Sequence, residues 1–377
     1  MSWAGHRKSA PLAGASGKVP EVETMNCAHR MSTSPNPLRL SVVFVARNSL
    51  SNIQKTLECL LAQTTAPRIE FILSANSPEL LREAEDFLAL RARFENSRFL
   101  LHRTQDMARA RALSAEEATG DIVAFNEDHC FPEPTWAEEL LAAFESSEDI
   151  QAAAPVMINP NPETAVSRVQ FLMFFGRHKK DSLSQPRFEN AGSLPTHNTV
   201  YRRGALVEML REGSLLAEGF LQEKIRANRP ATRFVRCTHT CVSHVNMSRF
   251  GPAIKQAFLG GKIFGSTRAK RMGWGPAAKA WRFLVFPLVP LMVVQRSASL
   301  LRDKASLTRT FSNFWTASIL QFVHVFGESI GACFGLGRAA GAYADTECDR
   351  RRFIRPAERP ILFSMQDTPG SQGNEHR

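Results

Sequence analysis

The sequence lacks the signals that mark exported and disulfide-bonded proteins. It has seven cysteines, an odd number, and no two of them form a C-x-x-C pair. A disulfide framework normally uses an even set at regular spacing, so these cysteines indicate a reducing compartment such as the cytosol. The first residues also lack the continuous apolar run of a secretory signal. We therefore expect the protein to stay in the cytoplasm.

Acidic residues are absent from a long segment in the second half of the chain. Between residues 224 and 302 there are fifteen lysines or arginines and no aspartate or glutamate, within a net charge of +11. Such a segment attracts the phosphates of a nucleotide, an anionic lipid surface or a nucleic acid. Because no nucleic-acid-binding motif accompanies it, we expect no nucleic-acid partner. A nucleotide diphosphate and an anionic membrane surface are the expected partners.

Long apolar runs are missing as well. The two most apolar stretches, residues 283–294 and 314–326, contain only 12 and 13 residues. A helix that spans a bilayer needs about 18 to 20 apolar residues, so neither stretch is expected to cross a membrane. Basic residues flank both stretches, which is typical of amphipathic helices that lie in a membrane interface. Ordinary packing against the rest of the protein is the open alternative.

From residue 40 the chain alternates short β-branched runs with amphipathic helical stretches. The expected strands cover residues 40–46, 69–74, 98–102, 121–126 and 152–157, with helices beginning near Ile53, Ser77 and Pro134. This alternation predicts an α/β fold with a doubly wound, mostly parallel sheet, followed by C-terminal amphipathic helices. Such sheets bind ligands at the carboxyl ends of their strands, so function is expected after Ala46, Ser74 and Asn126.

The composition divides the chain into four parts. Residues 1–37 are rich in Ser, Pro, Gly and Ala without periodicity and are expected to be a disordered tail. Residues 38–273 form the expected nucleotide-binding domain, and residues 274–345 the C-terminal helices associated with a membrane. Residues 346–377 are predicted to be a polar tail.

A polar turn follows the fourth expected strand. Glu127, Asp128 and His129 stand where a parallel sheet presents its site. Carboxylate and imidazole groups at that edge suit a divalent cation that bridges phosphates. A simple polar connection between strand and helix is the alternative.

A second group of possible metal ligands lies on one later segment. Cys237, His239, Cys241 and His244 follow one another at short intervals. Zinc sites usually separate two pairs of ligands by a longer loop, so a zinc knuckle is the less favoured interpretation. We expect a strand whose small side chains enter the core.

Several separated segments resemble family 2 glycosyltransferases of the GT-A fold. The resemblance covers residues 40–273 and rests on the joint order of its motifs. They are LSVVFVARN, ARALSAEEATGD, EDH in place of an acidic DxD motif, THNTVYRRGAL, LLAEGFLQEKI and SHVN. The resemblance implies transfer of a sugar, of hexose type, from a nucleotide-sugar donor to an acceptor hydroxyl. The expected interfacial helices indicate a glycan or lipid-linked acceptor, as in polysaccharide or glycolipid synthesis, and an enzyme at the inner face of the membrane.

The resemblance also implies which residues bind the donor. One departure affects this set, because Ser74 stands where the family commonly has an aspartate, so a contact to the base is weakened or supplied by Asn76. Lys262 and Arg268, on a basic helix, would reach the diphosphate. The full set is Ala46, Arg47, Asn48, Ser74, Asn76, Arg111, Glu127, Asp128, Asn198, Lys262 and Arg268.

Metal binding and catalysis complete the implied site. Glu127, His129 and His244 would hold Mn²⁺ or Mg²⁺, and imidazole ligands favour Mn²⁺. Glu218 or Glu223 would be the general base that deprotonates the acceptor hydroxyl, with Glu218 favoured. A single base without a second nucleophile predicts inversion at the anomeric carbon. The alternative is a catalytically silent protein of the same fold that binds a nucleotide or glycan.

Overall fold

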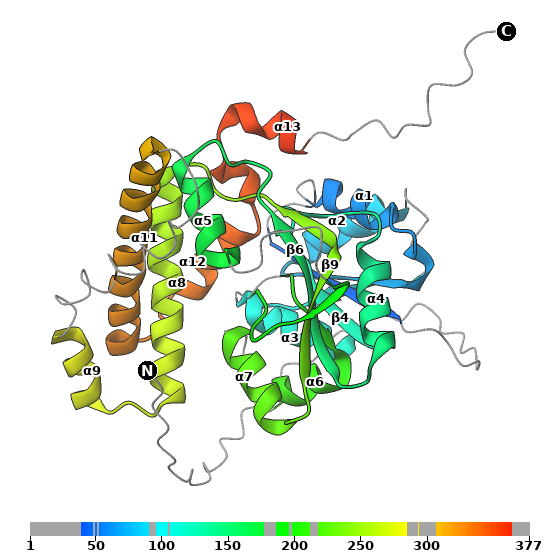
Figure 1. Cartoon of the computed structure of the whole chain (residues 1–377), viewed down its shortest axis with the longest axis horizontal. Helices are drawn as coiled ribbons and strands as arrows, with labels where there is room; N and C mark the ends of the chain where they lie inside the picture. The colour runs from blue at the N-terminus through cyan, green and yellow to red at the C-terminus, as the bar shows by residue number, and fades with distance from the viewer. Residues whose placement is uncertain are drawn as a thin grey trace.

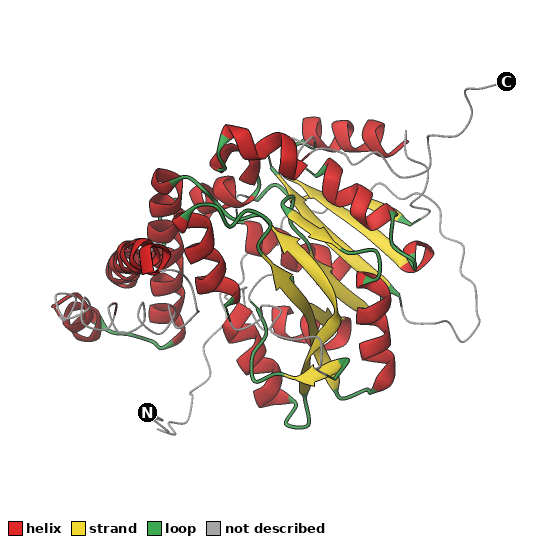
Figure 2. Cartoon of the chain, turned by 45° about the horizontal axis from the view of Figure 1, so that its top comes forward, coloured by secondary structure: helices red, strands yellow, loops and turns green. Residues whose placement is uncertain are grey.

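The computed structural model describes residues 39–47, 50, 53–89, 96–104, 106–176, 186–195, 198–211, 218–284, 293 and 307–363. These residues form a nine-stranded mixed sheet with helices on both faces, and further helices lie beside it (Figures 1 and 2). The strand order is β3-β2-β1-β4-β8-β6-β9-β5, with β7 paired to β9.

One half of the sheet is fully parallel. Its strands are β1 (Leu40–Ala46), β2 (Ile69–Ala75), β3 (Ser97–Leu101) and β4 (Ile122–Phe125). The register places Ala46 beside Ala75 and Ala75 beside Leu101, so the carboxyl ends of β1, β2 and β3 lie side by side. The residues that follow these strands therefore meet at one edge of the sheet.

The other half mixes directions. Its strands are β5 (Cys130–Pro132), β6 (Ile150–Ile158), β7 (Phe188–Asn190), β8 (Val200–Arg202) and β9 (Arg233–His244). Strand β8 runs antiparallel to both β4 and β6, whereas β6 and β9 are parallel. The short strand β5 pairs antiparallel with the end of β9.

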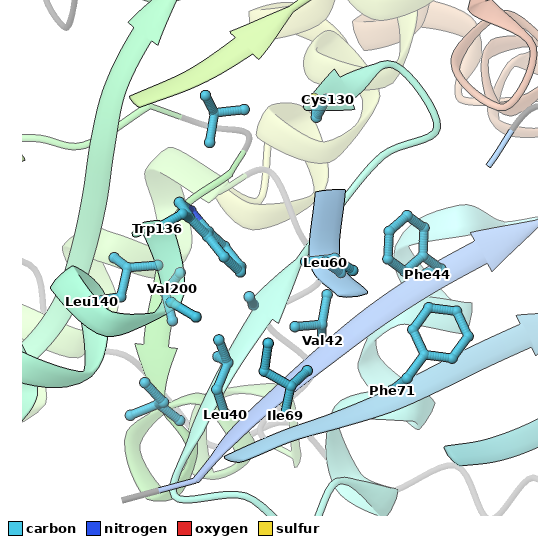
Figure 3. Close-up of a cluster of buried hydrophobic side chains, with 14 of the residues drawn as sticks. Leu40, Val42, Phe44, Leu60, Ile69, Phe71, Cys130, Trp136, Leu140 and Val200 are labelled. Carbon is cyan, nitrogen blue, oxygen red and sulfur yellow. The ribbon is translucent and has the colours of Figure 1, made fainter. Parts of the chain in front are cut away.

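Two sets of helices cover the two faces of the sheet. The first set packs on Leu40, Val42 and Phe44, and Figure 3 shows these side chains with Trp136 in one continuous core. The second set packs on Val43 and its neighbours. The first set is α1 (Gln54–Leu61), α2 (Pro78–Ala89) and α4 (Trp136–Ser146), and the second is α3 (Met107–Glu117), α6 (Arg203–Arg211) and α7 (Glu218–Asn228).

The fold class expected from the sequence is confirmed. The alternating side chains of β1 enter the two cores in turn, because successive residues of a strand point to opposite faces. All five expected strands are present within one or two residues of their bounds, as β1, β2, β3, β4 and β6.

Two long helices run in parallel beside the sheet domain. Helix α8 (Phe250–Arg271) contacts α11 (Leu307–Phe334), and α5 (Ala165–Phe175) and α12 (Ala339–Glu347) lie between this pair and the sheet (Figure 1). Helix α9 (Pro276–Leu284) follows α8. Glycines allow the two backbones to approach closely. A Cβ added at Gly265 would lie 2.0 Å from the backbone carbonyl oxygen of Glu328, and a Cβ added at Gly331 would lie 2.0 Å from the backbone carbonyl oxygen of Lys262. Residues with side chains are too large for this contact.

Helix α11 corrects the expectation of a short apolar stretch. Residues 314–326 form the middle of a helix of 28 residues, and residues 309–334 of it are long and apolar enough to cross a membrane by length and composition. The expected stretch was shorter because serine, threonine, asparagine and glycine interrupt the apolar residues toward both ends of this helix. Residues 283–284 end α9, and most of the other apolar stretch lies outside the described residues.

The C-terminal segment also differs from the expected polar tail. Residues 348–363 continue from α12 into two short turns, Arg350–Phe353 and Pro356–Glu358, and the helix α13 (Arg359–Phe363). Ile354 and Leu362 pack on Phe131 and Val245, and Arg350 is only 3% exposed. Apolar residues spaced among arginines anchor this segment to the ends of β5 and β9.

Candidate donor and metal site

The register of β5 and β9 brings distant residues together. After β4 ends at Phe125, a short turn leads into β5, where Cys130 pairs with His244. The Val245 amide donates to the His129 carbonyl at 3.0 Å, which continues the pairing beyond β5. Residues more than a hundred positions apart thus share one end of the sheet.

Glu127, His129 and His244 converge at this point. Their side chains are at most 6% exposed. Glu127 Oε2 lies 3.5 Å from His129 Nε2 and 3.6 Å from His244 Nε2. Ligands about 2.1 Å from a tetrahedrally coordinated ion are about 3.4 Å apart, so this spacing fits a metal ion. With Cys130, their possible ligand atoms all lie within 4.8 Å of one another.

Neighbouring side chains orient both imidazoles. The Nδ1 atom of His129 lies 2.6 Å from Asp128 Oδ1, and its Nε2 atom lies 3.3 Å from Arg350 Nη2. A guanidinium can only donate, so Nε2 accepts and the ring proton is on Nδ1, facing Asp128. His244 Nδ1 faces Asn246 Oδ1 at 3.2 Å. Both rings therefore direct Nε2 toward Glu127, as outer hydrogen bonds do in metal sites.

The chemistry of the donor set fits a divalent transition metal. Two imidazoles and one carboxylate suit Mn²⁺, Fe²⁺ or Zn²⁺ better than Mg²⁺, which prefers oxygen ligands. Cys130 is a poorer ligand, because burial raises the pKa of its thiol well above the usual value and keeps it protonated. It contacts Glu127 Oε2 at 3.5 Å and Asn198 Nδ2 at 3.3 Å.

Two arginines neutralise the buried carboxylates. Arg111, from α3, pairs with Glu127 at 3.0 Å, and both side chains are buried. Arg350 pairs with Glu347 at 2.8 Å. Burial would lower the pKa of Arg350, but Glu347 and Glu127 raise it above its usual value, so it stays charged. Burial raises the pKa of Asp128 well above its usual value.

Asn198 is held in an unusual backbone conformation beside this cluster. Its φ is 62°, the only positive value of a non-glycine residue in the described part of the chain. Asparagine tolerates this left-handed region better than most residues, yet such conformations persist mainly where the surroundings impose them. The result is that the Asn198 amide reaches Cys130.

A small pocket of about 10 Å³ lies at the ends of β1, β2 and β3. Its polar lining residues are Arg47, Ser74, Asn76, His102 and Thr104, and its other lining residues are Val45, Ala75, Met107 and Ala110. Ser74 Oγ and His102 Nδ1 are 2.9 Å apart. Arg47 pairs with Asp345 of α12 at 3.0 Å. The sequence predicted that Ala46, Arg47, Ser74 and Asn76 lie at the carboxyl end of the sheet. In the structure all four lie at the ends of β1 and β2.

A second small pocket, of about 10 Å³, borders the cluster on the side of the long helices. A chain of hydrogen bonds runs through it. Gln170 Nε2 donates to Gln256 Oε1 at 2.7 Å, Gln256 in turn donates to Glu347, and Glu347 accepts from Arg350. Arg350 also contacts His129. Helices α5 and α8 are therefore connected to the cluster by buried side chains.

Other expected site residues lie elsewhere. Glu223 is exposed on α7 and pairs with Arg271 at 3.6 Å, so the structure does not bring it to the cluster. Arg268 pairs with Glu328 at 3.0 Å, and Lys262 lies where α8 contacts α11. The physical reason is distance, because Arg268 is twelve residues, or roughly 18 Å, farther along α8 than Gln256. Asn48 and the side chain of Glu218 lie outside the described residues.

The cysteine and histidine segment forms a strand, as favoured from the sequence. On β9, Cys237 and Cys241 enter the core while His239 is exposed. Within the described chain, His244 alone of these four residues joins a group of possible metal ligands.

Sequence reasoning missed Arg350, Glu347 and His102. Arg350 and Glu347 stand at the boundary of the segment taken for a polar tail, where no motif precedes them. His102 ends an expected strand next to Ser74, and the serine in place of an aspartate was the one signal that pointed to this position.

Part of the chain matches a known protein family. Residues 41–210 match the family profile described as glycosyl transferase family 2. A curated relative, glucosyl-dolichyl phosphate glucuronosyltransferase of Haloferax volcanii, is 29% identical over 113 residues, which cover 28% of this chain and 34% of the relative. The chain thus spans about a third of that relative's length.

Two solved structures resemble the fold at low identity. The structure of GalNAc-T7 with UDP, GalNAc and Mn²⁺ is 16% identical, with a TM-score of 0.41 over 56% of this chain and 44% of that one. The structure of S. aureus TarS 1-349 with UDP is 11% identical, with a TM-score of 0.39 over 75% and 90%. Residues 41–210, just under half of the chain, are therefore identified by their sequence as a region similar to glycosyl transferase family 2.

Proposed function

We propose that the chain transfers a sugar from a nucleotide-sugar donor to an acceptor hydroxyl with the help of a divalent cation. The observation that carries this proposal is the convergence of Glu127, His129 and His244 at the end of the sheet where parallel α/β sheets bind their ligands. The family match over residues 41–210 supports sugar transfer as the reaction.

The charges around the cluster suit a diphosphate leaving group. Breaking the bond between an anomeric carbon and a diphosphate requires neutralisation of the charge that develops on the phosphate. A bound divalent cation would supply part of this neutralisation. Arg111 and Arg350 place two further positive charges next to Glu127 and His129. Arg350 must give up its contact with His129 Nε2 when this atom becomes a ligand.

Deprotonation of the acceptor requires one carboxylate. Glu218 is our proposed base, since Glu223 is exposed and paired with Arg271. One base and no second nucleophile imply inversion of configuration. Asn198, beside Cys130, is proposed to contact the transferred sugar.

The long helices are proposed to rest on the cytoplasmic face of a membrane. Trp315, Ile319, Phe322 and Phe326 repeat at helical spacing on α11 and are each 38% to 53% exposed. Between residues 310 and 334 the only charged side chain is Glu328, which pairs with Arg268. Exposed lysines on α8 would face anionic headgroups. A membrane-bound acceptor, in polysaccharide or glycolipid synthesis, follows from this placement, and the curated relative's name contains a dolichyl phosphate.

A donor panel tests the proposal. Thermal unfolding is measured with UDP-, GDP- and dTDP-sugars, with and without Mn²⁺, because a ligand of the native state raises the unfolding temperature. We expect one nucleotide to stabilise the protein only with Mn²⁺, and slow hydrolysis of that donor even without an acceptor. Stabilisation without hydrolysis or transfer would instead favour a silent binding protein. Failure of every donor to stabilise the chain would contradict the proposal.

A further inference from the structure

The metal cluster contains a fourth possible ligand that the proposed mechanism does not use. Cys130 begins β5, and its side chain is fully buried. Its thiol donates to Glu127 Oε2 at 3.5 Å, and the same carboxylate oxygen faces the Nε2 atoms of His129 and His244. One oxygen atom is therefore shared by three other possible ligands.

The distances within the cluster are close to those of a four-ligand zinc site. Zinc–sulfur bonds of about 2.3 Å and zinc–oxygen bonds of about 2.1 Å place the sulfur and oxygen of a tetrahedral site about 3.6 Å apart. Cys130 Sγ lies 3.5 Å from Glu127 Oε2, and the two imidazole nitrogens lie 3.5 Å and 3.6 Å from it. All four ligand atoms lie within 4.8 Å of one another. An ion among them would take the place of the thiol proton.

Asn198 supports the sulfur atom as a ligand. Its Nδ2 donates to Cys130 Sγ at 3.3 Å, from a backbone with a φ of 62°. An N–H group that donates to sulfur stabilises the negative charge of a thiolate. Glu127 and His129 have comparable outer partners in Arg111 and Asp128. The outer contacts of the cluster therefore extend to Cys130.

Divalent ions differ in whether they recruit a thiol. Zn²⁺ and Co²⁺ bind thiolate, and the coordinating thiol loses its proton to the solvent, whereas Mn²⁺ has little affinity for sulfur. With Glu127 and Cys130 both ionised, a bound Zn²⁺ has its two charges balanced and its four positions filled. A bound Mn²⁺ would keep one net positive charge and open positions for a diphosphate. Cys130 is thus a poor ligand for Mn²⁺ and a good one for Zn²⁺.

We propose that Cys130 determines the metal selectivity of this cluster. Zn²⁺ recruits Cys130 as a fourth ligand and forms a closed site, whereas Mn²⁺ leaves Cys130 unbound and the site open. Zinc is then an inhibitor that excludes the diphosphate of the donor. The exclusion of the donor rests on the proposed function, but the ligation of zinc does not.

Cobalt tests the ligation directly, because a thiolate bound to Co²⁺ gives a charge-transfer absorption band in the near ultraviolet. The full chain is titrated with Co²⁺, and displacement by Zn²⁺ then gives the zinc affinity. We expect the band in wild type and its loss in Cys130→Ser, with zinc affinity lower by at least about a hundredfold and Mn²⁺ affinity within about threefold of wild type. Cys333→Ser is the matched control. It removes a half-buried thiol of α11 and should keep the band and both affinities.

Nucleotide binding tests whether the zinc site is closed. Calorimetry with UDP and GDP compares protein loaded with Mn²⁺ and protein loaded with one equivalent of Zn²⁺. We expect binding to the zinc form of wild type to be weaker by about tenfold or more, and the difference to shrink in Cys130→Ser. Equal binding to both forms of wild type would overturn the closed site.

The other outcomes separate this inference from the proposed function. A band that persists in Cys130→Ser and Cys130→Ala, or cobalt binding without a band in wild type, would overturn the role of Cys130 and leave sugar transfer intact. A parallel loss of Mn²⁺ affinity in both variants would also overturn it, because the effect would then be structural. If neither nucleotide binds the manganese form, the proposed function fails, while the cobalt band still decides the ligation.

Discussion

The parallel half of the sheet and the pair of long helices differ in where their large apolar side chains lie. In the sheet, β1 buries alternate residues in two separate cores, and the proposed site residues lie at or beyond the carboxyl ends of the strands. In the helix pair, glycines bring α8 and α11 into backbone contact and large apolar side chains point outward. The first arrangement holds chemistry in place, whereas the second leaves an apolar face for a partner. Under the proposed function, chemistry and membrane attachment would belong to different parts of one chain.

The largest expected effect is on the chemistry of the sheet edge. His129→Ala removes one proposed metal ligand and should lower Mn²⁺-dependent turnover by about 10³-fold, since the ion supplies several kcal/mol of charge stabilisation. The measurement is the initial rate of donor hydrolysis over a range of Mn²⁺ concentrations. His239→Ala, an exposed histidine of β9, should keep full activity. Equal activity of His129→Ala and wild type would remove His129 from the site.

The second prediction concerns the outward face of α11. Trp315→Ser, Phe322→Ser and Phe326→Ser combined should weaken binding to vesicles of anionic lipid by at least about tenfold, because each large apolar side chain contributes on the order of 1 kcal/mol or more when buried. Thermal unfolding of the variant is measured in parallel, because Phe322 and Phe326 are only 39% and 38% exposed and Phe326 also contacts Phe258.

Ile361→Ser is the matched control, because Ile361 is apolar and 76% exposed but belongs to α13, a different helix from α11 (Figure 1). It should bind vesicles like wild type. If the triple variant also binds like wild type in a flotation assay, the apolar face serves another partner or none.

The third prediction tests the contact between the two helices. Gly265→Ala would place a Cβ 2.0 Å from the backbone carbonyl oxygen of Glu328, so α8 and α11 must move apart. We expect the free energy of unfolding to fall by about 1 to 3 kcal/mol. Gly251→Ala, in the first turn of the same helix, adds a Cβ that meets nothing within 4 Å apart from its chain neighbours, so it should leave the contact between the two helices unchanged. Equal stability of the two variants in urea would contradict the close packing.

The smallest expected effect is the pH dependence that the buried His102 gives to the free energy of unfolding. Burial lowers the pKa of His102 in the folded state, and Glu117 opposes this shift. Above about pH 6.5 His102 is neutral in both folded and unfolded chains, so it adds no pH dependence there. Below that pH the unfolded chain binds the proton first, and the free energy of unfolding falls by about 1 kcal/mol or less.

His102→Asn removes this contribution. Urea unfolding at pH 7.5 and pH 5.5 should therefore show a smaller loss of stability on acidification in the variant than in wild type. An identical loss of stability on acidification in both proteins would contradict the prediction that burial keeps the His102 ring neutral.

The sequence predicted much of the sheet and part of the site. The short β-branched run in residues 40–46 and the polar turn after Phe125 were enough to predict that Glu127 and His129 follow a strand at the edge of the sheet. His244 was expected nearby only through the family resemblance, and the pairing of Cys130 with His244 now explains its position. Local patterns cannot give such long-range registers.

The remaining misses have a common physical cause. Arg350 and Glu347 look like solvated tail residues in the sequence, because their burial depends on Ile354 and Leu362 packing against distant strands. Arg268 had the right spacing on a basic helix, but the length of α8 and the position of Glu328 decide where it points. For charged residues, tertiary packing rather than local composition determined which ones reach the cluster.

The most direct test of the central claim is the position of a bound metal ion. Crystals soaked with Mn²⁺ and measured at its absorption edge should show an anomalous peak within bonding distance, about 2.2 Å, of His129 Nε2, His244 Nε2 and Glu127 Oε2. The same experiment should show Arg350 displaced from His129. A peak at another position, or none at millimolar Mn²⁺ with UDP present, would contradict the account.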